Sequence, residues 1–265
     1  MPKCSIAVHG AAGRMGQRLV TLISQDEDLT LSAAIDVSQH PKIGTDVGVI
    51  VGIGSVGIVL SDTFSNSNKA DAVIDFSNAS AMEKILAACV SLNTPLVLAT
   101  TGLSSAQEKQ IHNAAKAIPI LWSPNTGMAV NIAFKLAQTA AKSLAGQNAD
   151  VEILERHHHH KVDAPSGTAL KFGEIIAREM GQNQSTHGRK GIVGERPGDE
   201  IGYHAIRVGD NPGEHTIVFG MLGELIEITV RVTNRDCYAY GAIAAAKYII
   251  GCSAGLYSMK DVLGL

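Results

Sequence analysis

The feature that most restricts the fold is a glycine-rich turn between a short apolar segment and an amphipathic one. Residues 3–9 read K-C-S-I-A-V-H, which is typical of a buried strand, and residues 17–23 have the apolar spacing of a helix. Between them, Gly10, Gly13 and Gly16 let the backbone turn sharply. Strand, glycine turn and helix in this order are the context of a dinucleotide-binding fingerprint, with the pyrophosphate at the helix N-terminus. The spacing G-x-x-G-x-x-G differs from the common G-x-G-x-x-G, so an ordinary glycine-rich turn is the alternative reading.

An acidic residue follows the next expected strand. That strand covers residues 29–35 and ends in Asp36. In a Rossmann fold, a carboxylate about 20 residues after the glycines accepts hydrogen bonds from the ribose hydroxyls of NAD. Val37 supplies no positive charge for a 2′-phosphate, although Arg14 or Lys42 could reach one. We therefore expect NADH as the cofactor, with NADPH as the alternative.

Strands and helices then alternate as far as residue 127. The expected strands are residues 72–76, 95–99 and 118–121, and the expected helices are residues 79–92 and 104–115. Residues 44–57 are rich in Gly, Val and Ile and indicate a loop with a short strand. Such alternation predicts a mostly parallel sheet with helices on both faces. Because ligands bind at the carboxyl ends of these strands, we expect residues 99–101 to border a nicotinamide.

The second half of the chain has a different pattern. Helices are expected at residues 128–144 and 169–180, and strands at 201–208, 215–221 and 224–233, beside one that starts near Val151. Residues 181–198 are polar and glycine-rich and predict a loop. These elements make an open sheet with one helix-covered face, and the apolar helix 238–250 is expected to complete the first domain. The predicted fold is α/β: an N-terminal Rossmann-type doubly wound parallel sheet (1–127, completed by 237–265) with an inserted α+β domain (128–236).

The reactive side chains gather in residues 152–169, which read E-I-L-E-R-H-H-H-H-K-V-D-A-P-S-G-T-A. A strand-like start leads into four histidines (157–160) and Lys161, and the segment ends at Gly167 and Thr168 just before a helix. A helix N-terminus offers backbone N–H groups and a positive partial charge. A small carboxylate or phosphate could bind there while His or Lys side chains reach it. The segment therefore predicts an anion site with proton donors.

Other readings of the histidines were weighed against this one. A solvated polar loop is the main alternative, because Lys and His side chains are commonly exposed. An affinity tag does not fit four histidines in the middle of a chain. If the strand persists, alternation sends His157 and His159 to one face and His158 and His160 to the other, so at most two share a ligand sphere. We expect no metal, since only Glu155 or Asp163 would be near enough to complete a site.

Composition excludes several classes of function. Of the 265 residues, 45% are hydrophobic and 18% charged, which fits a compact globular protein. The net charge is −3 and the 22 basic residues form no patch, so we expect no nucleic-acid partner. No apolar run is long enough for a membrane span and no signal pattern opens the chain, which predicts a cytoplasmic protein. The cysteines show no C-x-x-C spacing, so free thiols are expected. They are Cys4, Cys89, Cys237 and Cys252.

Taken together, these motifs resemble one family closely, the 4-hydroxy-tetrahydrodipicolinate reductases, or dihydrodipicolinate reductases, of the diaminopimelate route to lysine. The most specific motif is E-x-H-H-x-x-K-x-D-x-P-S-G-T-A, present from Glu155 to Ala169. The opening V-H-G-A-A-G-R-M-G, then A-T-T-G, S-P-N and G-E-H-T, occur in the expected order. The resemblance covers essentially the whole chain.

The resemblance implies an NADH- or NADPH-dependent reduction of a dicarboxylate cyclic imine by a homotetramer built through the sheets of the substrate-binding domain. It implies that His157 is the catalytic proton donor or acceptor and that Lys161 is the second proton donor. It also implies that His158, Gly167 and Thr168 contact the substrate. The implied cofactor contacts are Gly10, Ala11, Ala12, Gly13, Arg14, Met15, Asp36, Ala99, Thr100, Thr101, Ser123, Pro124, Asn125 and Thr126.

Three positions depart from the family pattern. Ala99 stands where glycine is commoner, Asn78 where some relatives carry a positive residue, and Val37 where many carry arginine. Two rival functions stay open at this point. One is a Rossmann dehydrogenase of another amino-acid precursor, and the other is a non-catalytic NAD(H)-sensing module.

Overall fold

The computed structural model describes residues 3–265, and the chain divides into two compact units. Unit 1 comprises residues 3–128 and Asp236–Leu265, and unit 2 comprises Ala129–Arg235. The expected divisions at 127/128 and 236/237 lie one residue from each of these boundaries.

Unit 1 is built on a seven-stranded sheet in the order β12-β6-β5-β4-β1-β2-β3. All of its pairings are parallel. The strands are β1 (Cys4–His9), β2 (Leu29–Ile35), β3 (Leu60–Ser61), β4 (Ala72–Asp75), β5 (Leu96–Leu98), β6 (Pro119–Trp122) and β12 (Gly255–Tyr257). The helices are α1 (Arg14–Gln25), α2 (Val47–Val51), η1 (Asn66–Asn68), α3 (Ala79–Ser91), α4 (Ser105–Ala114), α7 (Asp236–Ile249) and α8 (Met259–Leu263).

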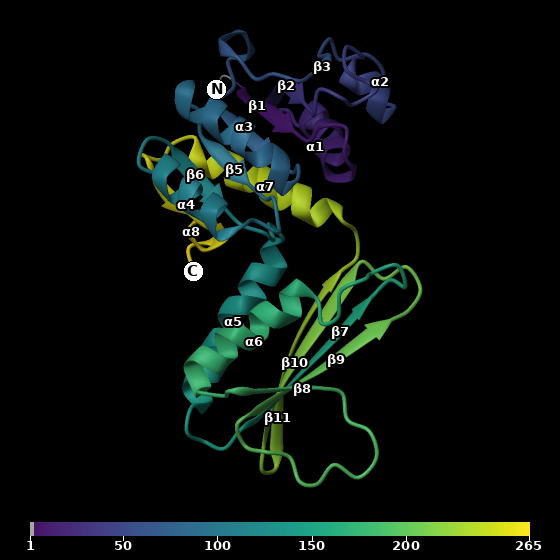
Figure 1. Cartoon of the computed structure of the whole chain (residues 1–265), viewed down its shortest axis with the longest axis vertical. Helices are drawn as coiled ribbons and strands as arrows, with labels where there is room; N and C mark the ends of the chain where they lie inside the picture. The colour runs from purple at the N-terminus through teal and green to yellow at the C-terminus, as the bar shows by residue number, and fades with distance from the viewer. Residues whose placement is uncertain (1–2) are drawn as a thin grey trace. The chain divides into compact units, whose positions relative to one another are not determined.

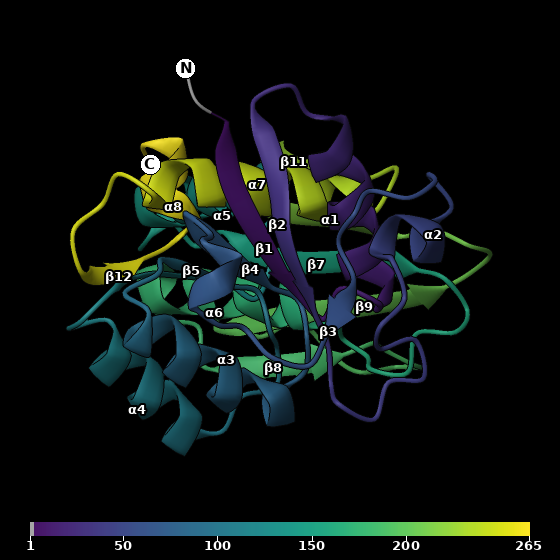
Figure 2. The same ribbon diagram turned by 90° about the horizontal axis from the view of Figure 1, so that it is seen from above.

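Helices cover both faces of this sheet because its strands are apolar on both sides (Figure 2). One face, which includes Ile6 and Val8, packs on α1 and α7. The other face, which includes Ala7 and Val73, packs on α3 and α4. Strand order reverses between β1 and β4, so ligand-binding segments are expected beside the carboxyl ends of these two strands. The predicted Rossmann-type doubly wound sheet is confirmed.

One local feature of unit 1 differs from its prediction, and one was not predicted. Residues 47–51 form the short helix α2 instead of a strand, because the Asp46 side chain accepts hydrogen bonds from the backbone N–H groups of Gly48 and Val49. The chain also continues after α7 into β12, which joins the edge of the sheet beside β6. Helix α2 is explained by a local side-chain cap, and β12 is explained by pairing with a strand far away in the sequence.

Unit 2 holds a five-stranded mixed sheet in the order β11-β10-β7-β9-β8. The strands are β7 (Asp150–His157), β8 (Gln184–His187), β9 (Glu200–Arg207), β10 (Gly213–Met221) and β11 (Glu224–Val232). Helices α5 (Met128–Leu144) and α6 (Gly167–Met180) lie side by side (Figure 1), joined by a 2.8 Å hydrogen bond from Gln138 to Glu179. Their apolar sides, which include Phe172 of α6, pack on the sheet and bury Ile153 and Phe219. The segment predicted as a loop, residues 181–198, contains β8, which pairs with β9 although it shows no apolar alternation.

Neither membrane spans nor disulfides are seen in residues 3–265. No helix there combines the length and the apolarity that crossing a bilayer requires. The four cysteines carry free thiols.

We predict that Gly241→Ala destabilises unit 1. A Cβ at position 241 of α7 would lie 1.8 Å from the carbonyl oxygen of Thr126, so the helix would have to move away from the segment after β6. Overpacking of this kind costs about 1–3 kcal/mol of unfolding free energy. Urea unfolding followed by circular dichroism measures the loss. Gly251→Ala is the matched control, because nothing lies within 4 Å of its added methyl group. Equal stability of the two variants would contradict the prediction.

Candidate active site

Four polar side chains meet on the helix-covered face of the unit 2 sheet. Glu155 and His157 lie on one face of the central strand β7, two residues apart. His215 of β10 is paired with Glu155, and Arg207 of β9 is paired with His157. The neighbouring strands therefore bring these groups to both sides of one carboxylate.

The carboxylate of Glu155 is the centre of this cluster, and its residue is 1% exposed. Arg207 donates two hydrogen bonds to it, at 2.8 and 2.9 Å. His157 Nδ1 lies 2.6 Å from Glu155 Oε2, and the backbone N–H of Ser166 donates to Oε1 at 3.0 Å. Because an ionised carboxylate can only accept, His157 carries its proton on Nδ1 and leaves Nε2 for other partners.

The pKa values of Glu155 and His157 are both lowered. Burial opposes the charge of Glu155, but the hydrogen bonds from Arg207 and His157 outweigh it and lower the carboxyl pKa. Burial also lowers the pKa of His157, and nearby Lys161 and Arg207 lower it further, while Glu155 opposes them. The cluster is therefore an ionised carboxylate beside an imidazole that is neutral at neutral pH.

His215 forms a second, more deeply placed contact. Its Nε2 lies 2.9 Å from Ser166 Oγ, and its ring packs edge-on against His157 at a centroid distance of 5.3 Å. Burial, together with the charge of His157, lowers the pKa of His215 to about 4. His215 is thus a neutral group that fixes Ser166, the N-cap residue of α6.

The histidines after β7 are not arranged as an extended strand. Strand β7 ends at His157, and a turn follows in which the backbone N–H of Lys161 donates to the carbonyl of His158. The strand does not persist beyond His157, so the condition for alternation of His157 and His159 against His158 and His160 is not met. The rings of His159 and His160 instead contact each other at a tilt of 48°, with a centroid distance of 3.8 Å. The backbone of this turn is held by carbonyls of residues 209 and 211, which lie in the β9–β10 connection.

Two cationic side chains stand at this turn. Lys161 Nζ lies 2.7 Å from the carboxylate of Asp163. The guanidinium of Arg235 lies 3.2 Å from His158 Nε2, while His158 Nδ1 is buried without a hydrogen-bond partner among the described residues. Burial and the charge of Arg235 lower the pKa of His158. The turn therefore places two cations and a neutral imidazole together.

Helix α6 begins at Gly167, directly after Ser166. The Ser166 hydroxyl accepts a hydrogen bond from the backbone N–H of Ala169. Gly167 has no heavy atom within 4 Å of the place where a Cβ would be, so its backbone is open to approach. Gly167 and Thr168 occupy the first turn, where the helix dipole favours an anion.

In unit 1, the glycine turn after β1 has the geometry that a dinucleotide requires. Gly10 has a left-handed φ of +76°, and a Cβ on Gly16 would lie 2.0 Å from the carbonyl oxygen of Gly10. Only glycine at these two positions permits the tight turn and the close packing of α1 on it. Gly13 caps α1 without a side chain, so the backbone N–H groups of Arg14 and Met15 open the helix.

Asp36 lies beside this turn. Its carboxylate accepts a 2.9 Å hydrogen bond from the backbone N–H of Ala12, and Ala11 donates to the carbonyl of Ile35. Each carboxylate oxygen has a second lone-pair site, so both could still accept from ribose hydroxyls. The structure thus brings the glycine turn and the acidic residue together at the carboxyl edge of the sheet.

The two other predicted cofactor segments follow β5 and β6. Thr100 Oγ1 donates to the buried carboxylate of Asp75, and Thr126 Oγ1 donates to the carbonyl of Tyr238. Ser123 Oγ likewise donates to the carbonyl of Asn125. These three hydroxyls donate their protons inside the protein, so none of them is left to donate a hydrogen bond to a cofactor. Ala99 is buried, whereas Thr101 and Pro124 are exposed.

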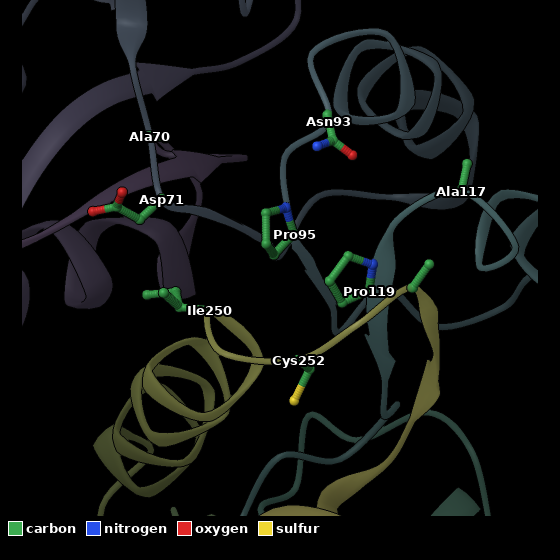
Figure 3. A pocket seen from close by; sticks show the side chains of 9 residues that line it. Ala70, Asp71, Asn93, Pro95, Ala117, Pro119, Ile250 and Cys252 are labelled. Carbon is green, nitrogen blue, oxygen red and sulfur yellow. The ribbon is translucent and has the colours of Figure 1, made fainter.

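No metal site is formed by these groups in residues 3–265, and one cavity of unit 1 lies away from them. Within residues 3–265 no set of three or more His, Cys, Asp and Glu side chains could hold a metal ion. A cavity of about 410 Å³ in unit 1 is lined by Asp71, Asn93, Pro95 and Pro119, among others (Figure 3). These residues precede or open strands β4, β5 and β6, so the cavity lies at the amino edge of the sheet, opposite the predicted cofactor segments.

Several of the residues described above, in both units, were not foreseen from the sequence. Arg207, His215, Arg235 and Asp75 were not predicted, and Glu155 appeared only as a motif member and a rejected metal ligand. His215 does lie in the G-E-H-T motif, which was a usable signal. The others reach their partners through sheet pairing or a chain reversal, for which a single sequence carries no pattern.

A Rossmann-type sheet in one unit and a buried acid–base cluster beside a helix N-terminus in the other define an oxidoreductase class. Comparison with known proteins identifies the member. The family model described as dihydrodipicolinate reductase, N-terminus, matches residues 4–126, and the one described as dihydrodipicolinate reductase, C-terminus, matches residues 129–263. The chain belongs to the dihydrodipicolinate reductase family, as its sequence motifs predicted.

Relatives match over the full length. A 4-hydroxy-tetrahydrodipicolinate reductase of Rhodopirellula baltica is 53% identical over 98% of this chain and 96% of that protein. One from Alkalilimnicola ehrlichii is 43% identical over 98% of both chains. A dipicolinate-bound dihydrodipicolinate reductase from Paenisporosarcina sp. TG-14 superposes with a TM-score of 0.79 at 23% identity, covering 97% of both chains. This last likeness shows that the fold is shared.

The buried His215 predicts that unfolding free energy falls as pH drops. In the unfolded chain His215 takes up a proton near pH 6.5, whereas in the folded protein it does so at about 4, so the unfolded state binds more protons in between. Its stabilising contribution is complete above pH 6.5 and declines towards pH 4, by about 2 kcal/mol from pH 7 to pH 5. Urea unfolding at both pH values should show this loss in the wild type and a smaller one in His215→Gln.

The control for this measurement is His187→Gln, which removes an exposed histidine of the same sheet. It should keep the pH dependence of the wild type. If His215→Gln also kept it, His215 would not be the group that titrates.

Proposed function

We propose that this chain reduces the cyclic imine derived from 4-hydroxy-tetrahydrodipicolinate to tetrahydrodipicolinate, with a reduced nicotinamide cofactor and with His157 and Lys161 as proton donors. The reductase activity in the diaminopimelate route to lysine is that of the family to which the chain belongs. The observation that carries the proposed mechanism is the Arg207–Glu155–His157 chain of hydrogen bonds.

The cofactor would be held at the carboxyl edge of the unit 1 sheet. The turn at Gly10 and the start of α1 fit a pyrophosphate, because no side chain caps the helix by a hydrogen bond. Asp36 would accept the ribose hydroxyls, and residues 99–101 and 123–126 would border the nicotinamide. When bound, this cofactor supplies the hydride.

The substrate is a dicarboxylate, which requires two sets of donors. The first turn of α6, at Gly167 and Thr168, would bind one carboxylate through backbone N–H groups and the helix dipole. Lys161 and His158, with Arg235 adding positive charge, would bind and orient the rest of the ring. Lys161 would exchange its contact with Asp163 for the substrate.

Reduction at one ring carbon leaves electron density that a proton must neutralise. Glu155 holds the Nδ1 proton of His157, so Nε2 is the nitrogen that must take up a proton from solvent and then pass it to the substrate. A Cβ at Gly213 would lie 3.0 Å from this Nε2, so the glycine keeps it accessible. The ionised Glu155 stabilises the imidazolium form that a donor needs, and Lys161 is the other candidate donor. One hydride and one proton complete the reduction.

The face of the unit 2 sheet that carries no helix would build the proposed homotetramer. Ile206 and Leu225 expose 38% and 65% of their surface there, although both lie in paired strands. A sheet face without a covering layer is a natural interface between copies of a chain. We also propose a cytoplasmic location, in line with the free thiols.

Turnover assays of variants test this function. Wild-type protein should oxidise NADH only when freshly generated dihydrodipicolinate-type imine is present. His157→Gln and Lys161→Ala should each lower kcat by about 10²–10⁴-fold, because each removes a proton donor. The dissociation constant of NADH, measured by fluorescence titration, should stay within about threefold, since both residues lie in unit 2.

His159→Gln is the matched control, because His159 is exposed and occupies a variable position of the motif. It should retain kcat to within about twofold. Weaker NADH binding with unchanged kcat in His157→Gln would contradict the assigned role.

The residues around Asp36 also predict which nicotinamide cofactor is preferred. The Asp36 carboxylate repels a 2′-phosphate, and the 40% exposed Val37 beside it supplies no compensating charge. We expect kcat/KM to favour NADH over NADPH by about tenfold or more. Val37→Arg should raise kcat/KM for NADPH by about tenfold through a charge-assisted contact.

Val49→Arg is the control for this change, since it adds the same charge at an exposed valine of α2 in the same unit. It should leave the ratio of the two kcat/KM values as in the wild type. Equal use of both cofactors by the wild type would contradict the preference for NADH.

A further inference from the structure

Unit 1 contains a buried polar cluster that the proposed mechanism does not use. Asp75 at the end of β4 is 0% exposed, Thr100 is 2% exposed and His9 is 4% exposed. Asp75 Oδ1 lies 2.7 Å from His9 Nδ1, and Asp75 Oδ2 accepts a 2.7 Å hydrogen bond from Thr100 Oγ1. The backbone N–H of Ser77 donates to Oδ1 at 3.1 Å.

The cluster lies at the carboxyl ends of three neighbouring strands. Asp75 is paired with His9 of β1 and with Leu98 of β5. Each hydrogen-bond partner of Asp75 lies in, or directly before, a segment at the carboxyl edge of the sheet. His9 precedes the glycine turn, Ser77 precedes the N-cap of α3, and Thr100 lies in the segment after β5.

The apolar core beneath does not require a carboxylate here. Below the cluster on the same face, the core consists of apolar side chains such as Ala7, Val73 and Leu98. Burying a charged or polar group costs stability unless every lone pair finds a donor, and an apolar side chain is often as stable. What Asp75 adds is a directional link between three chain segments that no apolar side chain could make.

We infer that Asp75 is a positioning residue of the cofactor site. It acts through His9 and Thr100, and it holds the glycine turn and the segment after β5 at one fixed separation. Because the Thr100 hydroxyl is directed at Asp75, Thr100 serves the cofactor by the placement of its backbone. This inference rests on the proposed function, since it takes these two segments to be the cofactor contacts.

The first test removes one hydroxyl. Thr100→Val keeps the shape of the side chain but loses the hydrogen bond to Asp75, and the dissociation constant of NADH in the full-length protein should rise about five- to twentyfold. Thr100→Ser restores the hydroxyl and should bring the constant back to within about twofold of the wild type. Fluorescence titration with NADH measures both.

Thr94→Val is the matched control. Thr94 is buried at the opposite end of β5, and its hydroxyl makes only a 3.4 Å contact with the carbonyl of Leu92. Thr94→Val is the same chemical change, made before β5 instead of after it, and should leave the NADH dissociation constant unchanged. Thermal unfolding of all variants separates weakened folding from weakened binding. If buried threonines only supported folding, Thr100→Val and Thr94→Val would both lower Tm, and neither would raise the dissociation constant of NADH.

The second test separates an indirect role of Thr100 from a direct contact with the cofactor. Asp75→Asn replaces the charged acceptor, and being fully buried, Asp75 cannot touch a ligand itself. We expect Asp75→Asn to weaken NADH binding about three- to tenfold and the double variant Asp75→Asn/Thr100→Val to be no weaker than Thr100→Val alone. Independent effects that multiply in the double variant would overturn the inference.

Equal NADH binding by Thr100→Val, Thr94→Val and the wild type would also overturn it. Failure of the proposed function gives a different result. In that case the wild type itself would bind NADH without oxidising it in the presence of the imine, whatever the variants do. Binding of dipicolinate, used as a dicarboxylate probe and measured by calorimetry, should be the same in all variants, because their substitutions lie in unit 1.

Discussion

The site in unit 2 depends on how one buried negative charge is solvated. Glu155 has lost nearly all contact with water, and an isolated carboxylate in that position would be protonated. It stays ionised because a guanidinium from β9, an imidazole from its own strand and a backbone N–H at the start of α6 surround it. Three elements are thereby fixed around the carboxylate, and the tautomer of His157 is fixed with them.

Unit 1 uses the same principle with weaker partners. Asp75 is also buried at the carboxyl end of a central strand, but an imidazole, a hydroxyl and one backbone N–H surround it instead of an arginine. In both units a carboxylate joins the ends of neighbouring strands to the segments that follow them. The difference follows from the task proposed for each: Glu155 must support a positive imidazolium, whereas Asp75 only needs to hold chain segments in place.

The fold could be predicted from the sequence wherever local chemistry decides it. The glycine turn, the alternation of strands and helices and the acidic residue after β2 are all short-range patterns, and each is found in the structure. Helix α2 was missed because its β-branched residues favour a strand, while the side chain of Asp46 stabilises a helical turn. Strand β8 was missed because pairing with β9 defines it and its own residues are polar.

The same distinction between local and long-range contacts applies to the candidate site. His157, Lys161 and the start of α6 lie within one short segment, so their spacing alone placed them together. Arg207 is 52 residues from Glu155, and His215 is 49 residues from Ser166; both reach the cluster only through sheet register. A one-residue shift of either pairing would turn these side chains to the other face. Spacing in the sequence therefore reveals the groups proposed to move protons, whereas those that set their protonation states become visible only when β7 is paired with β9 and β10.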